Sequence, residues 1–263
     1  MSILKRFLAN ETNLSGPDFN KADFLKIDLS GTSVFFKNPP LTCMIPYKLP
    51  ITTLDINTPH SFKKPVHDHE LVMTKQLNEN GWNFYSGISN GSAIGGMITS
   101  LSIFKSINHL SQDESFFVED NFINWILKEE KIQNDWLNNR RKERHESNTL
   151  NPNKLHLFSY PTSASEITKT NYNNYPWYSY TVKDSDGTEK IIYRTPVSRE
   201  DLLSLTIKPS CYRGDYYSDE HNLQEVISNT IEDLMRSMQI TLSADKEEQA
   251  RGSNSTMLAL ESV

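Results

Sequence analysis

The sequence predicts an α+β fold, an antiparallel sheet with a long central helix and a C-terminal amphipathic helix packed on it. Three observations carry this prediction. Large apolar residues recur at helical spacing between residues 119 and 145, two alternating segments flank an Asp-Gly turn at residues 184–187, and a second apolar stripe follows at 223–238. With 263 residues, 10% of them aromatic, the chain can bury a substantial core without a disulfide or a metal.

The first hundred residues predict mainly short elements. Residues 19–29 follow a turn and are expected to be helical, whereas residues 32–56 combine β-branched and aromatic residues with four prolines. Because proline cannot donate to a strand ladder, the latter predict short or edge strands. Asn80-Gly81 is typical of a turn before a strand at 82–86. Residues 92–107 fit a buried helix or a strand pair, and periodicity does not decide between the two.

The long helix predicted over residues 119–145 has acidic residues in its first turn and four basic residues in its last. This charge order complements the helix dipole, although Arg140, Arg141, Lys142 and Arg144 could also bind phosphate or an acidic partner. Beyond it, we expect a hairpin of residues 177–182 and 189–194, a strand at 202–207, a helix capped by Ser218 or Asp219, and a last strand at 240–242.

Composition suggests four regions along the chain. Residues 1–145 form an N-terminal α+β lobe, and the Asn-, Ser-, Thr- and Pro-rich residues 146–174 form a loop or linker with one short strand. Residues 175–243 form a C-terminal hairpin–strand–helix lobe. The polar residues 244–263 are expected to be a mobile tail, because they lack an apolar stripe that could pack.

The order of elements in the second half, a hairpin, a third strand and an amphipathic helix, resembles PsbP-like α+β domains. It is also similar to small α+β proteins that serve bacterial secretion systems as toxin-neutralising immunity proteins. The resemblance covers about 70 residues, rests on element order, and transfers no functional residue. It implies a bacterial immunity protein that neutralises a secreted toxin by direct binding.

Net charge and the lack of targeting signals disfavour several classes of function. The net charge of -6 disfavours nucleic-acid and anionic-membrane binding, and there is no apolar stretch long enough to span a membrane. Without an export signal, we expect a cytoplasmic protein in which Cys43 and Cys211 are reduced. No convincing catalytic set appears. The leading hypothesis is therefore a non-enzymatic protein, without metal or cofactor, whose partner is a basic toxin or effector.

The partner is expected to contact an aromatic segment, because tyrosine and tryptophan provide rigid, amphipathic contact area. Part of this segment must face the core, since alternate residues of a strand point inward. The predicted partner-binding residues are the exposed members of Tyr172, Tyr175, Trp177, Tyr178 and Tyr180.

The alternative is a serine hydrolase. Gly87-Ile88-Ser89-Asn90-Gly91 fits the G-x-S-x-G nucleophile elbow, and its context resembles α/β-hydrolases. That resemblance implies Ser89 as nucleophile, His221 as base, and Asp186 or Asp184 as the orienting acid. Both aspartates, however, lie in a tight hairpin turn, whereas the hydrolase acid follows a strand of a mostly parallel sheet.

Two further sets of residues have side chains that could carry chemistry. His67 and His69, in His67-Asp68-His69-Glu70, would share one face of an extended chain, with Glu70 or His60 near enough to complete a metal site. No ligand-spacing motif supports this site, so solvated loop histidines are the preferred interpretation. Cys43 or Cys211 could pair with His221 as nucleophile and base, but neither cysteine lies in a catalytic motif.

Overall fold

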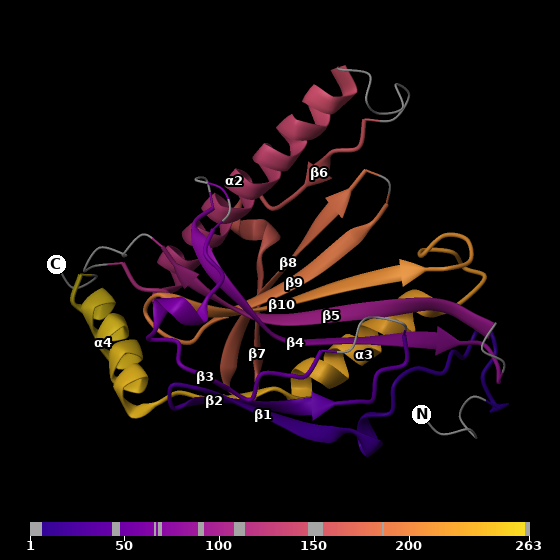
Figure 1. Ribbon diagram of the computed structural model, residues 1–263, viewed down its shortest axis with the longest axis horizontal. Helices are drawn as coiled ribbons and strands as arrows, with labels where there is room; N and C mark the ends of the chain where they lie inside the picture. Colours follow the sequence, from indigo (N-terminus) through magenta and orange to yellow (C-terminus); the bar gives the residue numbers. More distant parts are fainter. Residues whose placement is uncertain are drawn as a thin grey trace.

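The computed structural model describes residues 7–43, 48–65, 67, 70–88, 92–107, 114–146, 155–185 and 187–260. Within these residues, two largely antiparallel sheets and three α-helices confirm the α+β class (Figure 1). The elements are β1 (Asp23–Leu29), β2 (Thr32–Asn38), β3 (Thr53–Leu54), β4 (Val72–Tyr85), β5 (Ala93–Ser106), α2 (Glu119–Glu146), β6 (Phe158–Ser159), β7 (Thr168–Tyr172), β8 (Tyr175–Asp184), β9 (Glu189–Pro196), β10 (Asp201–Cys211), α3 (Leu223–Ser237), β11 (Gln239–Thr241) and α4 (Ala244–Leu260).

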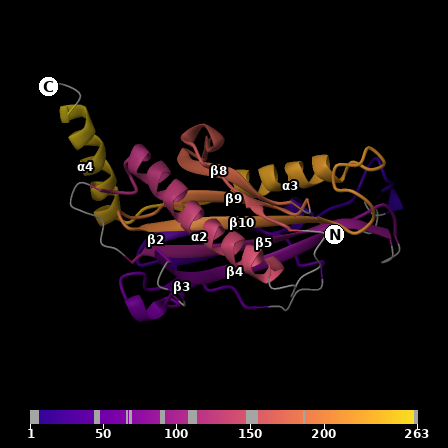
Figure 2. The same ribbon diagram turned by 90° about the horizontal axis from the view of Figure 1, so that it is seen from above.

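The larger sheet has the strand order β4-β5-β10-β9-β8-β6, with β7 also paired to β8, and the smaller sheet has the order β11-β2-β1-β3. Helix α2 crosses one face of the larger sheet (Figures 1 and 2). The opposite face packs against α3 and the smaller sheet, whose apolar side chains join those of β4, β5 and β10 in one core cluster. A second, smaller cluster lies beneath α2.

Strict alternation along β9 and β10 separates the two faces of the larger sheet. In β10, Leu203, Leu205 and Ile207 enter the core on the α3 side. The intervening Ser204 and Thr206 face α2 instead, as the two-residue period of a strand requires. One face of these strands is therefore apolar, and the other carries polar side chains under a helix.

The predicted hairpin is confirmed. Strands β8 and β9 pair antiparallel, with Tyr178 opposite Arg194 and Lys183 opposite Glu189. The predicted third strand corresponds to β10, and the long and C-terminal helices correspond to α2 and α3. Helix α3 begins after Asn222, so neither Ser218 nor Asp219 is its N-cap.

Several local predictions in the first half were wrong. Residues 19–29 form a short 3₁₀ turn and then β1, because Ile27 and Leu29 alternate into the core and packing outweighs local propensity. Asn80 lies inside β4 and not in a turn, since its side-chain amide is buried and donates to Pro39 O at 2.9 Å. Residues 93–106 form one strand, β5, which pairs antiparallel with β4.

The boundary predicted at residues 146–174 does not divide the sheet. Strand β5 precedes this boundary and pairs with β10, which follows it. Strand β7 lies within the predicted linker and pairs with β8. The two predicted lobes therefore share one continuous sheet.

Residues 244–253, predicted to lie in a mobile tail, are helical in the structure. These residues begin α4, where Lys246 is only 3% exposed and donates from Nζ to Leu29 O at 3.4 Å. Burial lowers the pKa of Lys246. A lysine can bury its long apolar stem, a capacity that a compositional argument about polar residues overlooks.

Candidate functional site

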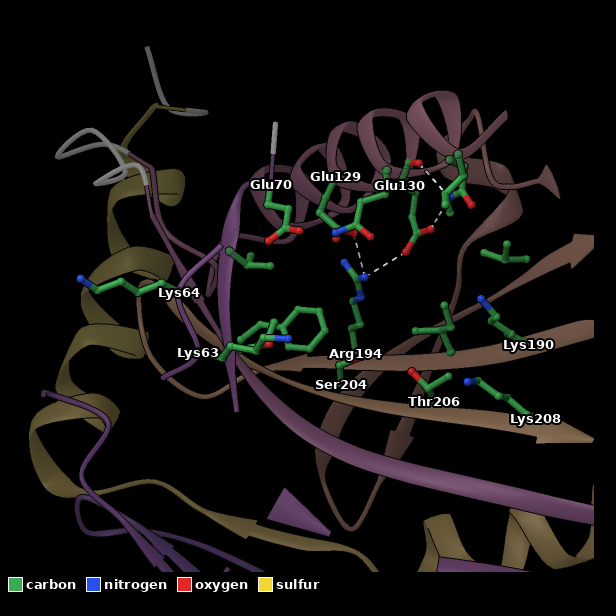
Figure 3. Close-up of a pocket in the computed structure, with 18 residues that line it drawn as sticks. Lys63, Lys64, Glu70, Glu129, Glu130, Lys190, Arg194, Ser204, Thr206 and Lys208 are labelled. Atoms are coloured by element: carbon green, nitrogen blue, oxygen red, sulfur yellow. Dashed lines mark hydrogen bonds and ion pairs between the residues drawn. The ribbon is translucent and has the colours of Figure 1, made fainter. Parts of the chain in front are cut away.

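A pocket of about 370 Å³ lies between α2 and the polar face of the larger sheet (Figure 3). We call it the α2 pocket. Its lining comes from α2, from strands β4, β5, β8, β9 and β10, and from the chain before β4. The lining residues are Lys63, Lys64, Glu70, Val72, Thr74, Phe104, Glu129, Glu130, Gln133, Asn134, Leu137, Val182, Lys190, Ile192, Arg194, Ser204, Thr206 and Lys208.

Helix α2 brings two glutamates to this pocket through its own periodicity. Trp125 and Ile126 pack in the core cluster beneath α2. Glu129 lies four residues after Trp125, and Glu130 lies four residues after Ile126. Positions four apart share a helix face, so the two glutamates lie on the same buried face of α2 as Trp125 and Ile126. The same face ends with Asn134, which is also buried.

Arg194 of β9 binds both glutamates from the sheet side. Its Nη2 donates to Glu129 Oε2 at 2.8 Å and to Glu130 Oε1 at 2.9 Å, and all three side chains are no more than 6% exposed. Glu130 also accepts hydrogen bonds from Tyr180 Oη at 2.6 Å and from Asn134 Nδ2 at 2.9 Å. Figure 3 shows Arg194 rising from the sheet towards the two glutamates on the helix.

Burial is the largest single influence on the pKa values of Glu129 and Arg194. It raises the pKa of Glu129 to about 7, with Glu130 adding to the rise and Arg194 opposing it. Burial alone would lower the pKa of Arg194, but Glu129, Tyr180 and Glu130 together outweigh it and raise that pKa. Arg194 is therefore charged at every physiological pH, whereas Glu129 changes its charge near neutrality.

Arg194 retains hydrogen-bonding capacity after binding the glutamates. Its Nε and Nη1 atoms are buried and have no hydrogen-bond partner within the described part of the chain. The guanidinium lies over the rings of Phe104, Trp125 and Tyr180 at 5.4–5.6 Å from their centroids. Aromatic faces attract the cation but accept its N–H groups poorly. Such buried donors favour an additional acceptor.

Two lysines stand at one end of the pocket. In the register of β9 with β10, Ile191 is opposite Ile207, which places Lys190 directly opposite Lys208 (Figure 3). Like charges directly opposite one another destabilise a sheet. Burial lowers the pKa of Lys190, and Lys208 adds to the effect. No ion pair joins either lysine to an acidic side chain among the described residues. An anion would relieve the repulsion between them.

The aromatic residues predicted to bind a partner serve mainly the core. Tyr172, Trp177, Tyr178 and Tyr180 are at most 9% exposed, and Tyr175 is half-buried with its hydroxyl donating to Pro196 O at 2.7 Å. Their burial leaves little of the first four side chains on the surface of this structure. That the chain binds and neutralises a toxin stays a prediction.

The context of the G-x-S-x-G sequence differs from a nucleophile elbow. Ser89 and Asp186 lie outside the described residues, but the segments that flank Ser89 are β4 and β5, an antiparallel pair. An elbow joins a strand of a mostly parallel sheet to a helix. Asp184 accepts from Arg141 Nη1 at 2.6 Å, and His221 contacts Cys211.

The two remaining candidates are the histidine metal site and the cysteine–histidine pair. Asp68 and His69 lie outside the described residues, and the ring of His67 lies 4.7 Å from that of Trp136. The described residues contain no group of three or more His, Cys, Asp and Glu side chains arranged to hold a metal. In contrast, the structure does bring Cys211 and His221 together.

Sequence reasoning missed the residues that form the α2 pocket, although one signal for them was present. Once the hairpin and third strand are aligned, the two-residue period places Lys190, Ile192 and Arg194 on one face with Ser204 and Thr206. A polar face in the middle of a sheet indicates a binding site or a covering polar helix. The partners of Arg194 on α2 come from tertiary packing, which no local pattern specifies.

No protein-family model matches this chain, and no curated protein matches it. Within the described residues, none of the helices has the length and apolar content needed to cross a membrane.

Proposed function

We propose that this protein binds a small organic anion, one that carries a phosphate or carboxylate group, in the α2 pocket. The observation that carries the proposal is the facing pair Lys190 and Lys208, which no ion pair joins to an acidic side chain among the described residues. The orphaned donors of Arg194 support it. The pocket volume falls within the range of small-molecule sites.

The charges that line the pocket also favour an anion. Five cationic side chains (Lys63, Lys64, Lys190, Arg194 and Lys208) stand against three acidic ones (Glu70, Glu129 and Glu130). Protonation of Glu129 near neutrality would increase the positive excess. The local field of the pocket is therefore opposite in sign to the net charge of the whole chain.

The hydroxyl groups of the pocket suggest how a ligand would be oriented. On β10, Ser204 lies opposite Arg194, and Thr206 lies between Ser204 and Lys208 (Figure 3). A ligand whose acidic group contacts Lys190 and Lys208 would bring hydroxyl or amide groups over these side chains. Hydroxyls can both donate and accept, so they suit a polar ligand with either kind of group.

We propose binding in preference to acid–base catalysis because the carboxylates are already engaged. Both oxygens of Glu130 accept hydrogen bonds from protein groups, and Glu129 is held by Arg194. A general acid or base must instead reach a proton of the substrate. The network is better suited to holding Arg194 in place beneath the ligand.

The test compares two variants that lose the same charge. Lys190→Gln with Lys208→Gln removes the facing pair, and Lys21→Gln with Lys26→Gln removes two exposed lysines outside the pocket. The melting temperature of each is measured with increasing inorganic phosphate or citrate, against sodium chloride at equal ionic strength. A ligand that binds only the folded state raises the melting temperature, and the rise grows with the logarithm of the ligand concentration above the dissociation constant.

We expect phosphate or citrate to raise the melting temperature of the wild-type protein and of the Lys21/Lys26 control, but not that of the Lys190/Lys208 variant. Absence of any specific rise in the wild-type protein would contradict the proposal. An equal rise in both variants would also contradict it, because the anions would then act on the protein surface in general.

A further inference from the structure

Cys211 and His221 contact each other on the apolar side of the larger sheet, the side that faces α3. They lie outside the α2 pocket. Cys211 is the last residue of β10, and His221 lies just before α3. Their Sγ and Nε2 atoms are 3.5 Å apart. The loop between β10 and α3 thus folds back and places an imidazole against a thiol.

Of the described groups that contact Sγ, the imidazole of His221 is the base that can accept the thiol proton. Two backbone carbonyls also lie near Sγ, Arg213 O at 3.1 Å and Ile94 O at 3.6 Å. A carbonyl can accept a hydrogen bond from the neutral thiol but is too weak a base to take its proton. The imidazole of His221 can take the proton, which leaves a thiolate, the nucleophilic form of cysteine.

The second nitrogen of His221 indicates what kind of chemistry the pair suits. His221 Nδ1 is buried and has no hydrogen-bond partner among the described residues. In hydrolytic triads a third group holds the imidazole through this nitrogen. Without such a group, the pair fits attack on a reactive sulfur better than hydrolysis of an ester or amide.

We infer that Cys211 is a reactive thiol, with His221 as its base, that forms mixed disulfides with low-molecular-weight disulfides. In this step His221 Nε2 takes the proton of Cys211, and Sγ attacks one sulfur of the disulfide. A new sulfur–sulfur bond forms as the old one breaks. The departing thiolate receives the proton from His221, so no further oxidant is needed.

Cys43 provides an internal comparison. It is buried, whereas Cys211 is half-buried at the end of a strand, next to the exposed Tyr212. Neither cysteine is in a disulfide, so each can serve as the reference for the other. Accessibility and a neighbouring base together predict a large difference in reactivity.

The experiment measures thiol release from a nitrobenzoic acid disulfide, which is coloured, and then from glutathione disulfide with mass spectrometry of the adduct. Cys43→Ser isolates Cys211, and Cys211→Ser isolates Cys43. His221→Gln in the Cys43→Ser background removes the base. His221→Gln in the Cys211→Ser background shows whether the fold still protects Cys43.

At neutral pH we expect Cys211 to react faster than free glutathione, and its rate to fall roughly tenfold without His221. Cys43 should stay unreactive in both backgrounds. The inference is overturned if Cys211 reacts no faster than glutathione, or if His221→Gln leaves its rate unchanged while Cys43 stays protected. If His221→Gln makes Cys43 reactive, His221→Asn is measured in place of His221→Gln. The same two outcomes would then overturn the inference.

Discussion

The two faces of the larger sheet are covered by helices in opposite ways. On the α3 side, side chains such as Trp177, Leu205 and Ile231 form an apolar core. On the α2 side, apolar packing covers part of the face and then gives way to Arg194 and the glutamates of the α2 pocket. The same strands supply both faces, so the difference lies in alternate residues of one segment of chain.

The two faces differ in how much their buried side chains contribute to the stability of the fold. Burying apolar surface stabilises the fold directly. Burying an arginine with two carboxylates contributes little net stability, because desolvation offsets their attraction. This cluster lines the α2 pocket, where we propose that the anion binds.

The largest expected effect is on the apolar face. Trp177, on β8, is 1% exposed within the core cluster. Trp177→Ala should lower the free energy of unfolding by about 3–5 kcal/mol, because it removes a large buried side chain and leaves a cavity. Denaturant titration measures the loss. Phe24→Ala, at a position that is 56% exposed, is the control and should have a small effect. Similar losses for both would contradict the contrast between core and surface.

Arg194→Met tests the polar face. It leaves Glu129 and Glu130 buried without their cation, and we expect the free energy of unfolding to fall by about 3 kcal/mol. Adding Glu129→Gln and Glu130→Gln should restore most of this stability. If Arg194→Met alone is as stable as the wild-type protein, the three side chains are more hydrated than their burial indicates.

The pH dependence of stability sharpens the same contrast. The pKa of Glu129 is raised to about 7 in the folded state, above its ordinary value of 4.5, so the folded state holds this proton more tightly. Its contribution to the free energy of unfolding should therefore be present below pH 4 and be lost as the pH rises to 7, by at most about 3 kcal/mol. Glu129→Gln should remove this part of the pH profile. The groups that face Glu129 are Glu130 on α2 and Arg194 on β9. An unchanged profile in the variant would assign the titration to another group.

The smallest expected effect is at the lysine pair. Lys190→Gln removes one of two facing like charges and should raise the free energy of unfolding by about 0.5 kcal/mol. The same change should weaken the response to phosphate or citrate. Lys26→Gln, on the exposed surface of β1, should change neither quantity. A loss of stability in Lys190→Gln would mean that its packing over Phe158, at 5.3 Å from the ring centroid, outweighs the repulsion.

The parts of the fold that follow from local patterns could be predicted from the sequence. The hairpin of β8 and β9 was predicted because both strands alternate around an Asp-Gly turn. Helix α2 was predicted because its apolar stripe and terminal charges agree. Asn80 was wrongly placed in a turn, because its amide is satisfied by Pro39 and Asn38 from a distant segment.

The candidate site was harder to predict for the same physical reason. Glu129 and Glu130 look like exposed helical residues until Arg194 is known to lie beneath them. Lys246 looks like part of a mobile tail until its contact with Leu29 is known. Each of these polar residues is buried by a partner remote in sequence, and spacing along the chain does not reveal that partner.

The pairing of β5 with β10 has a consequence for synthesis on the ribosome. Lys105 and Asp201 bind each other across a separation of 96 residues. Pairings so remote in sequence slow folding, because the intervening chain must be closed first. As the chain emerges, the β4–β5 hairpin has an unpaired edge until β10 is translated, and such edges promote aggregation. Chaperone binding to the nascent chain should therefore be strongest after β5 has emerged, and should decline once β10 has left the exit tunnel.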